Sequence, residues 1–157
     1  MISGKKILVV VPARGGSKGL KLKNIQKIGG IPLVGHAANC INKLEGIDRS
    51  IISTDSLKIK EVSKEYNLEA PFIRPESLSG DFVSDYDVLI HALFQMEMID
   101  NTTFDLVVML QPTSPLRKAE HIIKCINLLI EKNYDSVWTI SETDLKFHPL
   151  KQLVISD

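Results

Sequence analysis

The chain has 157 residues, 44% hydrophobic and 24% charged, which is the composition of an ordinary soluble globular protein that folds as one domain over residues 1–157. Nineteen basic and nineteen acidic residues cancel, so no overall positive field is available to hold a polyanion such as duplex DNA. No apolar stretch approaches membrane-spanning length or the pattern of a signal peptide, so we expect a cytoplasmic protein that binds neither membranes nor nucleic acid.

The first predicted element is a strand over residues 7–11. Its five residues are all apolar, without the alternation that a half-exposed strand shows. Strands of this kind are covered on both faces, as in parallel sheets flanked by helices. We therefore expect a central strand of a parallel sheet.

Residues 12–24, here named the first loop, change character at once. Within them lie Arg14, Gly15, Gly16, Ser17, Lys18, Gly19, Lys21 and Lys23. Glycines let backbone N–H groups approach an anion closely, and cations neutralise its charge, so the pattern favours a phosphate site. Neither a Walker A loop nor a dinucleotide fingerprint fits the spacing, and a G-x-x-G clamp does not normally follow an apolar strand. A flexible basic surface loop remains the alternative.

The middle of the chain alternates helix and strand patterns. The predicted elements are a helix from Pro32 to about Leu44, a strand over 47–53, a helix over 57–66, a short edge strand over 71–73 and a helix from Asp85 to about Met98. Asp55 is interpreted as the N-cap of its helix in preference to a metal ligand. Between residues 74 and 84 lies a polar segment, here named the Arg74 loop.

A second apolar run over residues 105–110 predicts another central strand. The second loop, residues 111–117, follows it with two prolines, hydrogen-bonding side chains and the cation Arg117, features of a rigid binding loop. A helix over 118–132 comes next. The last predicted element is a strand over 134–140, in which Trp138 packs.

Alternating strands and helices indicate an α/β fold, with an open and mostly parallel sheet. In such sheets ligands bind beyond the carboxyl ends of the strands, where both polar loops are expected. If their strands are neighbours, the two loops form one site. The residues by themselves indicate a nucleotide or sugar-phosphate site and single out no general base or nucleophile.

Motifs along nearly the whole chain resemble those of the acylneuraminate cytidylyltransferases. They are the first-loop run Pro12-Ala13-Arg14-Gly15-Gly16-Ser17-Lys18-Gly19 with Leu22-Lys23-Asn24, and then Gly35-His36, Ser53-Thr54-Asp55, Arg74-Pro75, His91-Ala92-Leu93, residues 110–117 and His148-Pro149-Leu150-Lys151. Each motif alone is weak, but the combination in this order is specific. The resemblance implies a three-layer, Rossmann-like nucleotidyltransferase of the nucleotide-diphospho-sugar transferase type.

The activity implied by this resemblance is transfer of CMP from CTP to a nine-carbon keto-sugar acid, with release of pyrophosphate. The implied nucleotide-binding residues are Ala13, Arg14, Gly15, Gly16, Ser17, Lys18, Lys23, Asn24 and Arg74. Among them Arg14 and Lys18 are expected to act as electrostatic catalysts. The implied sugar-binding residues are Gln111, Thr113, Ser114, His148 and Lys151, although a structural turn at His148 explains that motif equally well.

Members of this family continue past the position of Asp157. The resemblance implies that their further region supplies an acidic pair for Mg²⁺, more of the sugar pocket and a dimer-forming extension. Asp81 and Asp85 are the carboxylates nearest the predicted site, although loop or helix-cap roles are favoured for both. Besides a cytidylyltransferase, two alternatives stay open: an inactive CTP-binding fragment and, less favoured, a nucleic-acid-binding fragment. The sugar is N-acetylneuraminate, legionaminate or pseudaminate.

Overall fold

The computed structural model describes residues 1–140 and residue 142. The chain divides into two compact units, residues 1–120 and residues 121–157. The first unit contains the parallel sheet and the two polar loops, and the second contains most of helix α4 (Ala119–Lys132). Whether the chain folds as a single domain stays a prediction.

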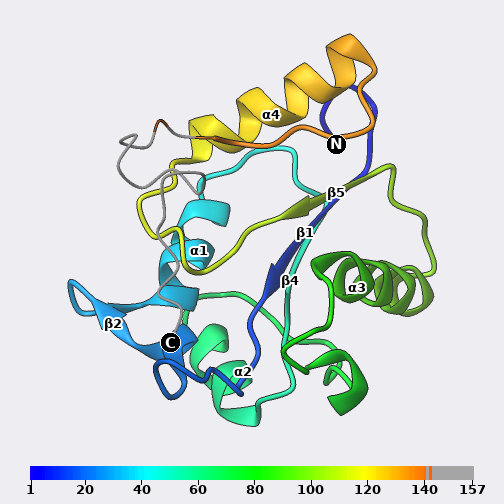
Figure 1. Ribbon diagram of the computed structural model, residues 1–157. Coiled ribbons are helices and arrows are strands. Elements are labelled where there is room, and N and C mark those ends of the chain that lie inside the picture. The colour runs from blue at the N-terminus through cyan, green and yellow to red at the C-terminus, as the bar shows by residue number, and fades with distance from the viewer. Residues whose placement is uncertain (141, 143–157) are drawn as a thin grey trace, which may run out of the picture. The chain divides into compact units, whose positions relative to one another are not determined.

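The sheet of the first unit has three parallel strands (Figure 1). Strand β1 (Ile7–Pro12) lies between β4 (Arg49–Ser53) and β5 (Leu106–Met109), and both pairings are parallel. Residues 7–11 are fully buried because β1 has a partner at each edge and cover on both faces. The prediction of a central parallel strand is confirmed for β1. The second predicted central strand, β5, is parallel but lies at the edge of the described sheet, where it has one strand neighbour and is only half-buried.

Helices lie on opposite sides of this sheet (Figure 1). On one side α3 (Asp85–Asp100) packs Ala92 and Met96 against side chains of β1 and β4. On the other side lies α1 (Leu33–Ile41), which contacts α2 (Leu57–Lys64). The first unit is therefore the α/β arrangement of layers that the sequence predicts, with helices close to their predicted bounds.

A small hairpin before α1 was not predicted. Strand β2 (Lys27–Ile28) pairs antiparallel with β3 (Ile31–Pro32), and Gly29 and Gly30 form the turn with positive φ angles of 59° and 83°. Two successive positive φ angles are typical of a tight hairpin turn, and a Gly-Gly pair is one of its signals. Pro32 consequently ends β3, and α1 begins one residue later than predicted.

Two predicted strands are wrong. Residues 71–73 are not a strand, since the neighbouring pairing consists of a single bridge between Ile51 and Glu69 and Pro71 has no N–H to extend it. Residues 134–140 also form no strand, and Trp138 is 81% exposed instead of packed. Apolar composition is not enough for a strand, which needs a neighbour to complete its hydrogen bonds, and no described residue pairs with this segment.

In the second unit, α4, predicted over 118–132, buries Ile122 and Ile126. The spacing of these residues is that of one helix face.

Short 3-10 helices complete the described elements at Lys23–Ile25 (η1) and Glu76–Leu78 (η2), both in the first unit. None of the helices in residues 1–140 is both long and apolar enough to cross a membrane.

Candidate functional site

The carboxyl ends of β1 and β5 open into a cavity of about 590 Å³. The first loop, the Arg74 loop and the second loop all line it. This is the place where ligands bind in open parallel sheets. Because β1 and β5 are neighbours, the expectation that the two polar loops form one site is confirmed.

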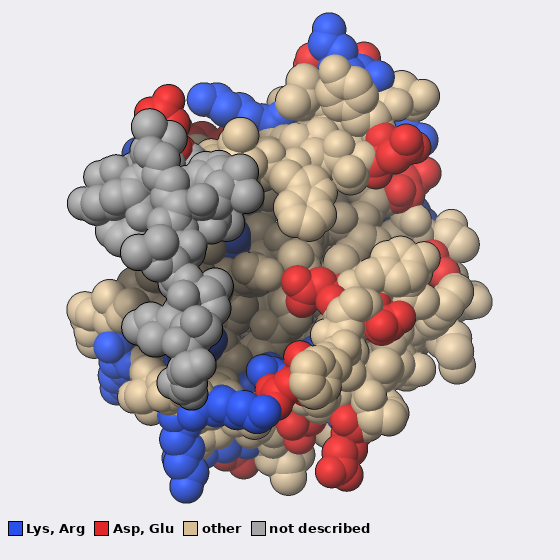
Figure 2. Space-filling model, viewed as in Figure 1, with Lys and Arg blue, Asp and Glu red and all other residues tan. Residues whose placement is uncertain are grey.

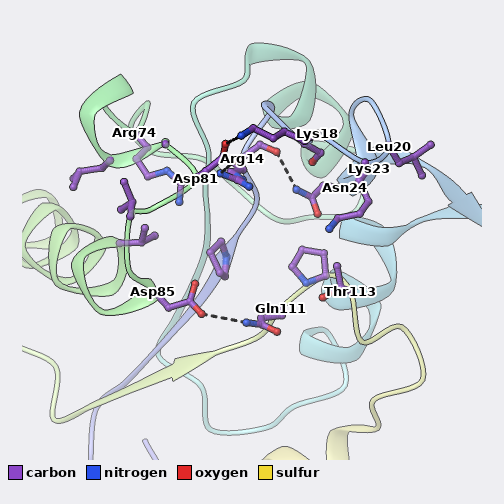
Figure 3. Close-up of a pocket in the computed structure, with 18 residues that line it drawn as sticks. Arg14, Lys18, Leu20, Lys23, Asn24, Arg74, Asp81, Asp85, Gln111 and Thr113 are labelled. Atoms are coloured by element: carbon purple, nitrogen blue, oxygen red, sulfur yellow. Dashed lines mark hydrogen bonds and ion pairs between the residues drawn. The ribbon is translucent and has the colours of Figure 1, made fainter. Parts of the chain in front are cut away.

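The first loop supplies cations to one end of the cavity. Its polar side chains in the lining are Ser17 and, labelled in Figure 3, Arg14, Lys18, Lys23 and Asn24. Nη1 of Arg14 lies 2.8 Å from Oδ1 of Asp81, and the ammonium of Lys18 pairs with Oδ2 of the same carboxylate. These two cations hold the pKa of Asp81 below its ordinary value, with the Lys18 hydrogen bond as the largest cause. Two neighbouring cations therefore already bind one anion at this end.

Asn24 fixes the backbone of the first loop. It is 6% exposed, and its Nδ2 donates a 3.0 Å hydrogen bond to the backbone carbonyl of Arg14 (Figure 3). Asn24 lies in η1, whose backbone turn brings its side chain back toward Arg14. The side chain of Arg14 consequently starts from a fixed point on the cavity wall.

Asp55 holds the same loop from the end of β4. Its Oδ1 accepts a 2.8 Å hydrogen bond from the backbone N–H of Gly15. The predicted N-cap role of Asp55 is wrong by one residue, since Ser56 caps α2 by accepting from the N–H of Ile59. A Cβ atom on Gly15 would stand 3.0 Å from Cβ of Ser56, so a larger residue here would crowd the N-cap of α2.

Arg74 is a buried cation in the cavity wall, with only 3% of its surface exposed. Its backbone N–H donates to the carbonyl of Thr54 at 2.8 Å, and its Nε donates to Oγ of Ser79 at 3.3 Å. Burial lowers the pKa of its guanidinium, and the charges of Asp55 and Asp85 oppose that effect. Its side chain lines the cavity, and Nε is the guanidinium nitrogen with a hydrogen-bond acceptor among the described residues.

The second loop forms the opposite end of the cavity. Nε2 of Gln111 donates a 3.2 Å hydrogen bond to Oδ2 of Asp85, the first residue of α3 (Figure 3). The backbone carbonyl of Gln111 accepts from Nη1 of Arg117 at 3.3 Å, and Thr113 also lines the cavity. This end is polar and includes the carboxylate of Asp85, whereas the first-loop end is rich in cations.

Charge is therefore unevenly distributed around the cavity. Figure 2 shows the hollow on this face of the molecule, with blue basic side chains directly beside red acidic ones at its rim. A phosphate chain matches the cationic end, and a polyhydroxylated group matches the amide and hydroxyl groups at the other. The cavity thus suits a ligand that has both.

The family model described as cytidylyltransferase matches residues 8–153, which is most of the chain. The chain belongs to the cytidylyltransferase family. This result confirms the family that the motifs of the first and second loops indicated.

Curated relatives of this cytidylyltransferase chain act on related sugar acids by name. The chain is 37% identical over 123 residues to the CMP-N,N'-diacetyllegionaminic acid synthase of Legionella pneumophila, covering 78% of this chain and 53% of that protein. It is 34% identical over 154 residues to an N-acylneuraminate cytidylyltransferase of Streptococcus agalactiae, covering 97% and 35%. A pseudaminic acid cytidylyltransferase of Campylobacter jejuni is 32% identical over 139 residues, covering 87% and 59%. The chain thus spans about half the length of these relatives or less.

Solved structures of other cytidylyltransferases share the fold. A CMP:2-keto-3-deoxy-manno-octonic acid synthetase complexed with CTP superposes with a TM-score of 0.69 at 21% identity, covering 82% of this chain and 48% of that one. A 4-diphosphocytidyl-2C-methyl-D-erythritol synthase gives a TM-score of 0.59 at 10% identity, covering 78% and 54%. At such identities the likeness supports the predicted nucleotidyltransferase fold.

Eight of the predicted site residues of this cytidylyltransferase line the cavity. The other predicted positions in the described part do not: Ala13 is fully buried beside the sheet, and Gly15, Gly16 and Ser114 lie in the loops outside the lining. His148 and Lys151 lie outside the described residues. The backbone N–H of Ala13 donates to the carbonyl of Ser53, so this residue anchors the loop to β4.

Sequence reasoning missed the contacts that connect the loops. Asp81 was interpreted as a loop residue and instead binds Arg14 and Lys18. The helix-cap reading of Asp85 is also wrong, because Ser84 caps α3 and Asp85 accepts from Gln111. The acidic residues that follow Arg74 in the sequence were a weak sign that one of them binds a cation of the first loop. No local pattern identifies the partners of Asp81 or of Asp85.

Proposed function

We propose that this chain transfers CMP from CTP to the anomeric hydroxyl of a nonulosonic acid and releases pyrophosphate. The observation that carries the proposal is the shape of one cavity: the cations of the first loop at one end, buried Arg74 in the wall and the amide of Gln111 at the other end. A triphosphate, a base and a sugar acid need these three environments. The names of the relatives support the choice of cytosine and of this class of sugar acid.

Arg14, Lys18 and Lys23 bind the triphosphate in this proposal, together with Ser17. Nucleotidyl transfer depends mainly on alignment and on stabilisation of charge at the transferring and leaving oxygens. Asn24 fixes the backbone of Arg14, so the guanidinium starts from a defined point on the cavity wall when charge develops on the departing pyrophosphate. Removing one such preorganised donor typically lowers the rate by a factor of about a hundred to a thousand.

Arg74 reads the base in this proposal. Nε of its guanidinium is bound to Ser79, and the backbone is held by Thr54, so the remaining N–H groups have a defined direction. Carbonyl oxygens and ring nitrogens at the edge of cytosine accept hydrogen bonds from such a planar donor. Buried hydrogen-bonding groups discriminate strongly, because a base that cannot satisfy them leaves them unpaired.

Gln111, Thr113 and Ser114 contact the sugar acid in this proposal, together with His148 and Lys151 beyond the described residues. Gln111 already donates to Asp85, which orients its amide toward the cavity. N-acetylneuraminate, legionaminate and pseudaminate share the carboxylate and the anomeric hydroxyl that such groups recognise. The proposal is therefore made for the class of nonulosonic acids.

The proposed reaction uses Mg²⁺, which carboxylates of this chain would bind. Nucleotide-bound Mg²⁺ is usually held by one or two carboxylates together with phosphates, and Asp81 and Asp85 both line the cavity. Asp85 makes no ion pair within the described residues, so it is the carboxylate that would hold the ion. The bound ion supplies positive charge at the phosphate oxygens. Among residues 1–140 and 142, no group of three or more metal-ligating side chains forms a closed cage.

We further propose that the activated sugar supplies a surface polysaccharide and that the reaction takes place in the cytoplasm. The relatives from Legionella, Streptococcus and Campylobacter carry names of activating enzymes for these sugars. Homodimer formation, expected for the longer members of the family, is kept as part of this proposal. Light scattering at several protein concentrations measures it directly.

The experiment is a transfer assay with the purified chain, CTP and Mg²⁺, run separately with N-acetylneuraminate, N,N'-diacetyllegionaminate and pseudaminate. Product CMP-sugar and pyrophosphate are both measured. We expect stoichiometric formation of the two products with at least one sugar acid, and loss of most of the rate in Gln111→Ala. CTP binding without transfer to any sugar would contradict the proposed activity and leave a nucleotide-binding fragment.

A further inference from the structure

Asp81 occupies the cations that the proposed function assigns to the triphosphate. One carboxylate oxygen pairs with Arg14 at 2.8 Å and the other pairs with Lys18 (Figure 3). Its side chain is 26% exposed, against 34% for Arg14 and 80% for Lys18. The ion pairs are therefore reachable by a soluble anion entering the cavity.

The geometry of these pairs is that of a bound phosphate. The two oxygens of the Asp81 carboxylate each bind a different cation, as two oxygens of one phosphate group would. The donors of Lys18 and Arg14 cannot serve a carboxylate and a phosphate at their full strength at the same time. A carboxylate left next to a triphosphate also repels it.

The segment that carries Asp81 is lightly held. The Arg74 loop is fixed at its start by the Arg74 to Thr54 hydrogen bond and at its end by the Ser84 cap of α3. Between these points the ion pairs of Asp81 are the only polar contacts found for residues 80–83 within the described part of the chain. Phe82 is fully exposed, and the one other apolar side chain of the segment, Val83, is only half-buried in the cavity wall. Displacing Asp81 disrupts little else.

We propose that Asp81 is an exchangeable anion that competes with phosphate groups for Arg14 and Lys18. It weakens the binding of the triphosphate and, after transfer, pairs with the cations again as pyrophosphate leaves. Ligands with several phosphates displace it, and those with a single phosphate do so poorly. This inference rests on the proposed function for its place in the reaction, but it concerns inorganic polyphosphate as well as CTP.

The test is a calorimetric titration of inorganic tripolyphosphate into wild type, Asp81→Asn and Glu76→Gln, without divalent metal. Glu76 is the matched control. It lies in the same loop but outside the cavity lining, and Glu76→Gln removes the same charge as Asp81→Asn. Breaking two partly exposed ion pairs changes an equilibrium by about three- to thirtyfold, so Asp81→Asn binds tripolyphosphate tighter by that factor. Equal affinities in Asp81→Asn and Glu76→Gln, or weaker binding in Asp81→Asn, would overturn the proposal.

A second measurement uses the wild-type chain alone. Saturation with tripolyphosphate draws Lys18 and Arg14 away from Asp81, so the pKa of the Asp81 carboxyl, followed by NMR, should rise toward its ordinary value. An unchanged or lower pKa would also overturn the proposal. Neither measurement uses cytosine or a sugar acid. Displacement of Asp81 can therefore succeed or fail independently of the transfer assay that tests the proposed function.

Discussion

Oδ1 of Asp55 accepts a hydrogen bond of 2.8 Å from the backbone N–H of Gly15, 40 positions earlier in the chain. This bond ties the end of β4 to the start of the first loop, directly beside the cations Arg14 and Lys18. The loop is consequently fixed by its backbone, while the side chains of Arg14, Lys18 and Lys23 line the cavity. Asp55 also lies close enough to favour the charged form of Arg74, so one carboxylate supports both parts of the candidate nucleotide site.

Asp55→Ala is expected to lower the free energy of unfolding by about 1–2 kcal/mol, because a partly buried N–H loses a charged acceptor. Asp55→Asn keeps an acceptor oxygen and is expected to lose less than half as much. Urea denaturation of the three proteins measures both values. Identical stability of Asp55→Ala and wild type would show that the loop is held by other contacts.

Gly15→Ala and Gly16→Ala compare a glycine that is packed against a neighbouring side chain with a glycine that has open space beside it. Gly15→Ala places a methyl group 3.0 Å from Cβ of Ser56 and should destabilise the fold by about 1–3 kcal/mol. A Cβ on Gly16 meets nothing within 4 Å, so its effect on stability should stay within about 0.5 kcal/mol. Gly16→Ala should instead weaken CTP binding if phosphates approach that backbone. Thermal unfolding and CTP titration of both variants check the pair, and the reverse assignment would refute it.

Arg74→Lys tests whether the planar donor group is needed. The positive charge that balances Asp55 and Asp85 is retained, so the variant should fold. Loss of the fixed fork of donors should weaken CTP binding by about ten- to a hundredfold and reduce the preference for CTP over UTP. Titrations with both nucleotides measure this. Unchanged preference in Arg74→Lys would remove Arg74 from base recognition.

His91 makes stability depend on pH. Its pKa is lowered below the ordinary value of 6.5 by burial and then by the charge of Arg74, and its Nδ1 is buried without a hydrogen-bond partner. Because the unfolded chain takes up this proton first, the free energy of unfolding should fall as the pH drops below about 6.5. His91→Leu should show a flatter curve between pH 7.5 and 5.5. Parallel curves for the two proteins would contradict the assignment.

Asp81 and Asp105 titrate in a different range. Both have pKa values below the ordinary 3.8, lowered first by the Lys18 hydrogen bond in Asp81 and by the backbone N–H of Lys6 in Asp105. A carboxyl whose pKa is lower in the folded than in the unfolded chain stabilises the fold at pH values above its unfolded pKa. That contribution is lost as the pH falls through its folded pKa. The contribution of these two groups is therefore constant between pH 5.5 and 7.5, so it does not obscure that of His91.

The parts of the fold that follow from local pattern were predicted from the sequence. The apolar run at residues 7–11 became a buried parallel strand and the run at 106–109 a half-buried one, and the helix predicted from Asp85 to about Met98 became α3. Hydrophobic periodicity decides such elements, because burial on one or both faces is their main source of stability. The two loops could be placed together because carboxyl ends of parallel strands share one edge of the sheet.

What the sequence did not reveal depends on partners distant in the chain. Asp55 binds Gly15 and Asp81 binds Arg14 only because three loops converge, and nothing next to either aspartate indicates this. The segment 134–140 has residues typical of strands, but a strand exists only when a neighbour completes its hydrogen bonds. Site residues on the loops were found by type, and their contacts required the folded chain.

Titration of CTP into wild type, Lys18→Ala and Lys21→Ala in the presence of Mg²⁺ is the most direct test that the cations of this cavity bind a nucleotide triphosphate. Lys18 lines the cavity and Lys21 does not, although both are exposed lysines of the first loop. Binding to wild type and Lys21→Ala, with affinity at least about tenfold weaker in Lys18→Ala, is the expected result. Equal affinity of the two variants, or no binding of CTP by the wild-type chain, would contradict it.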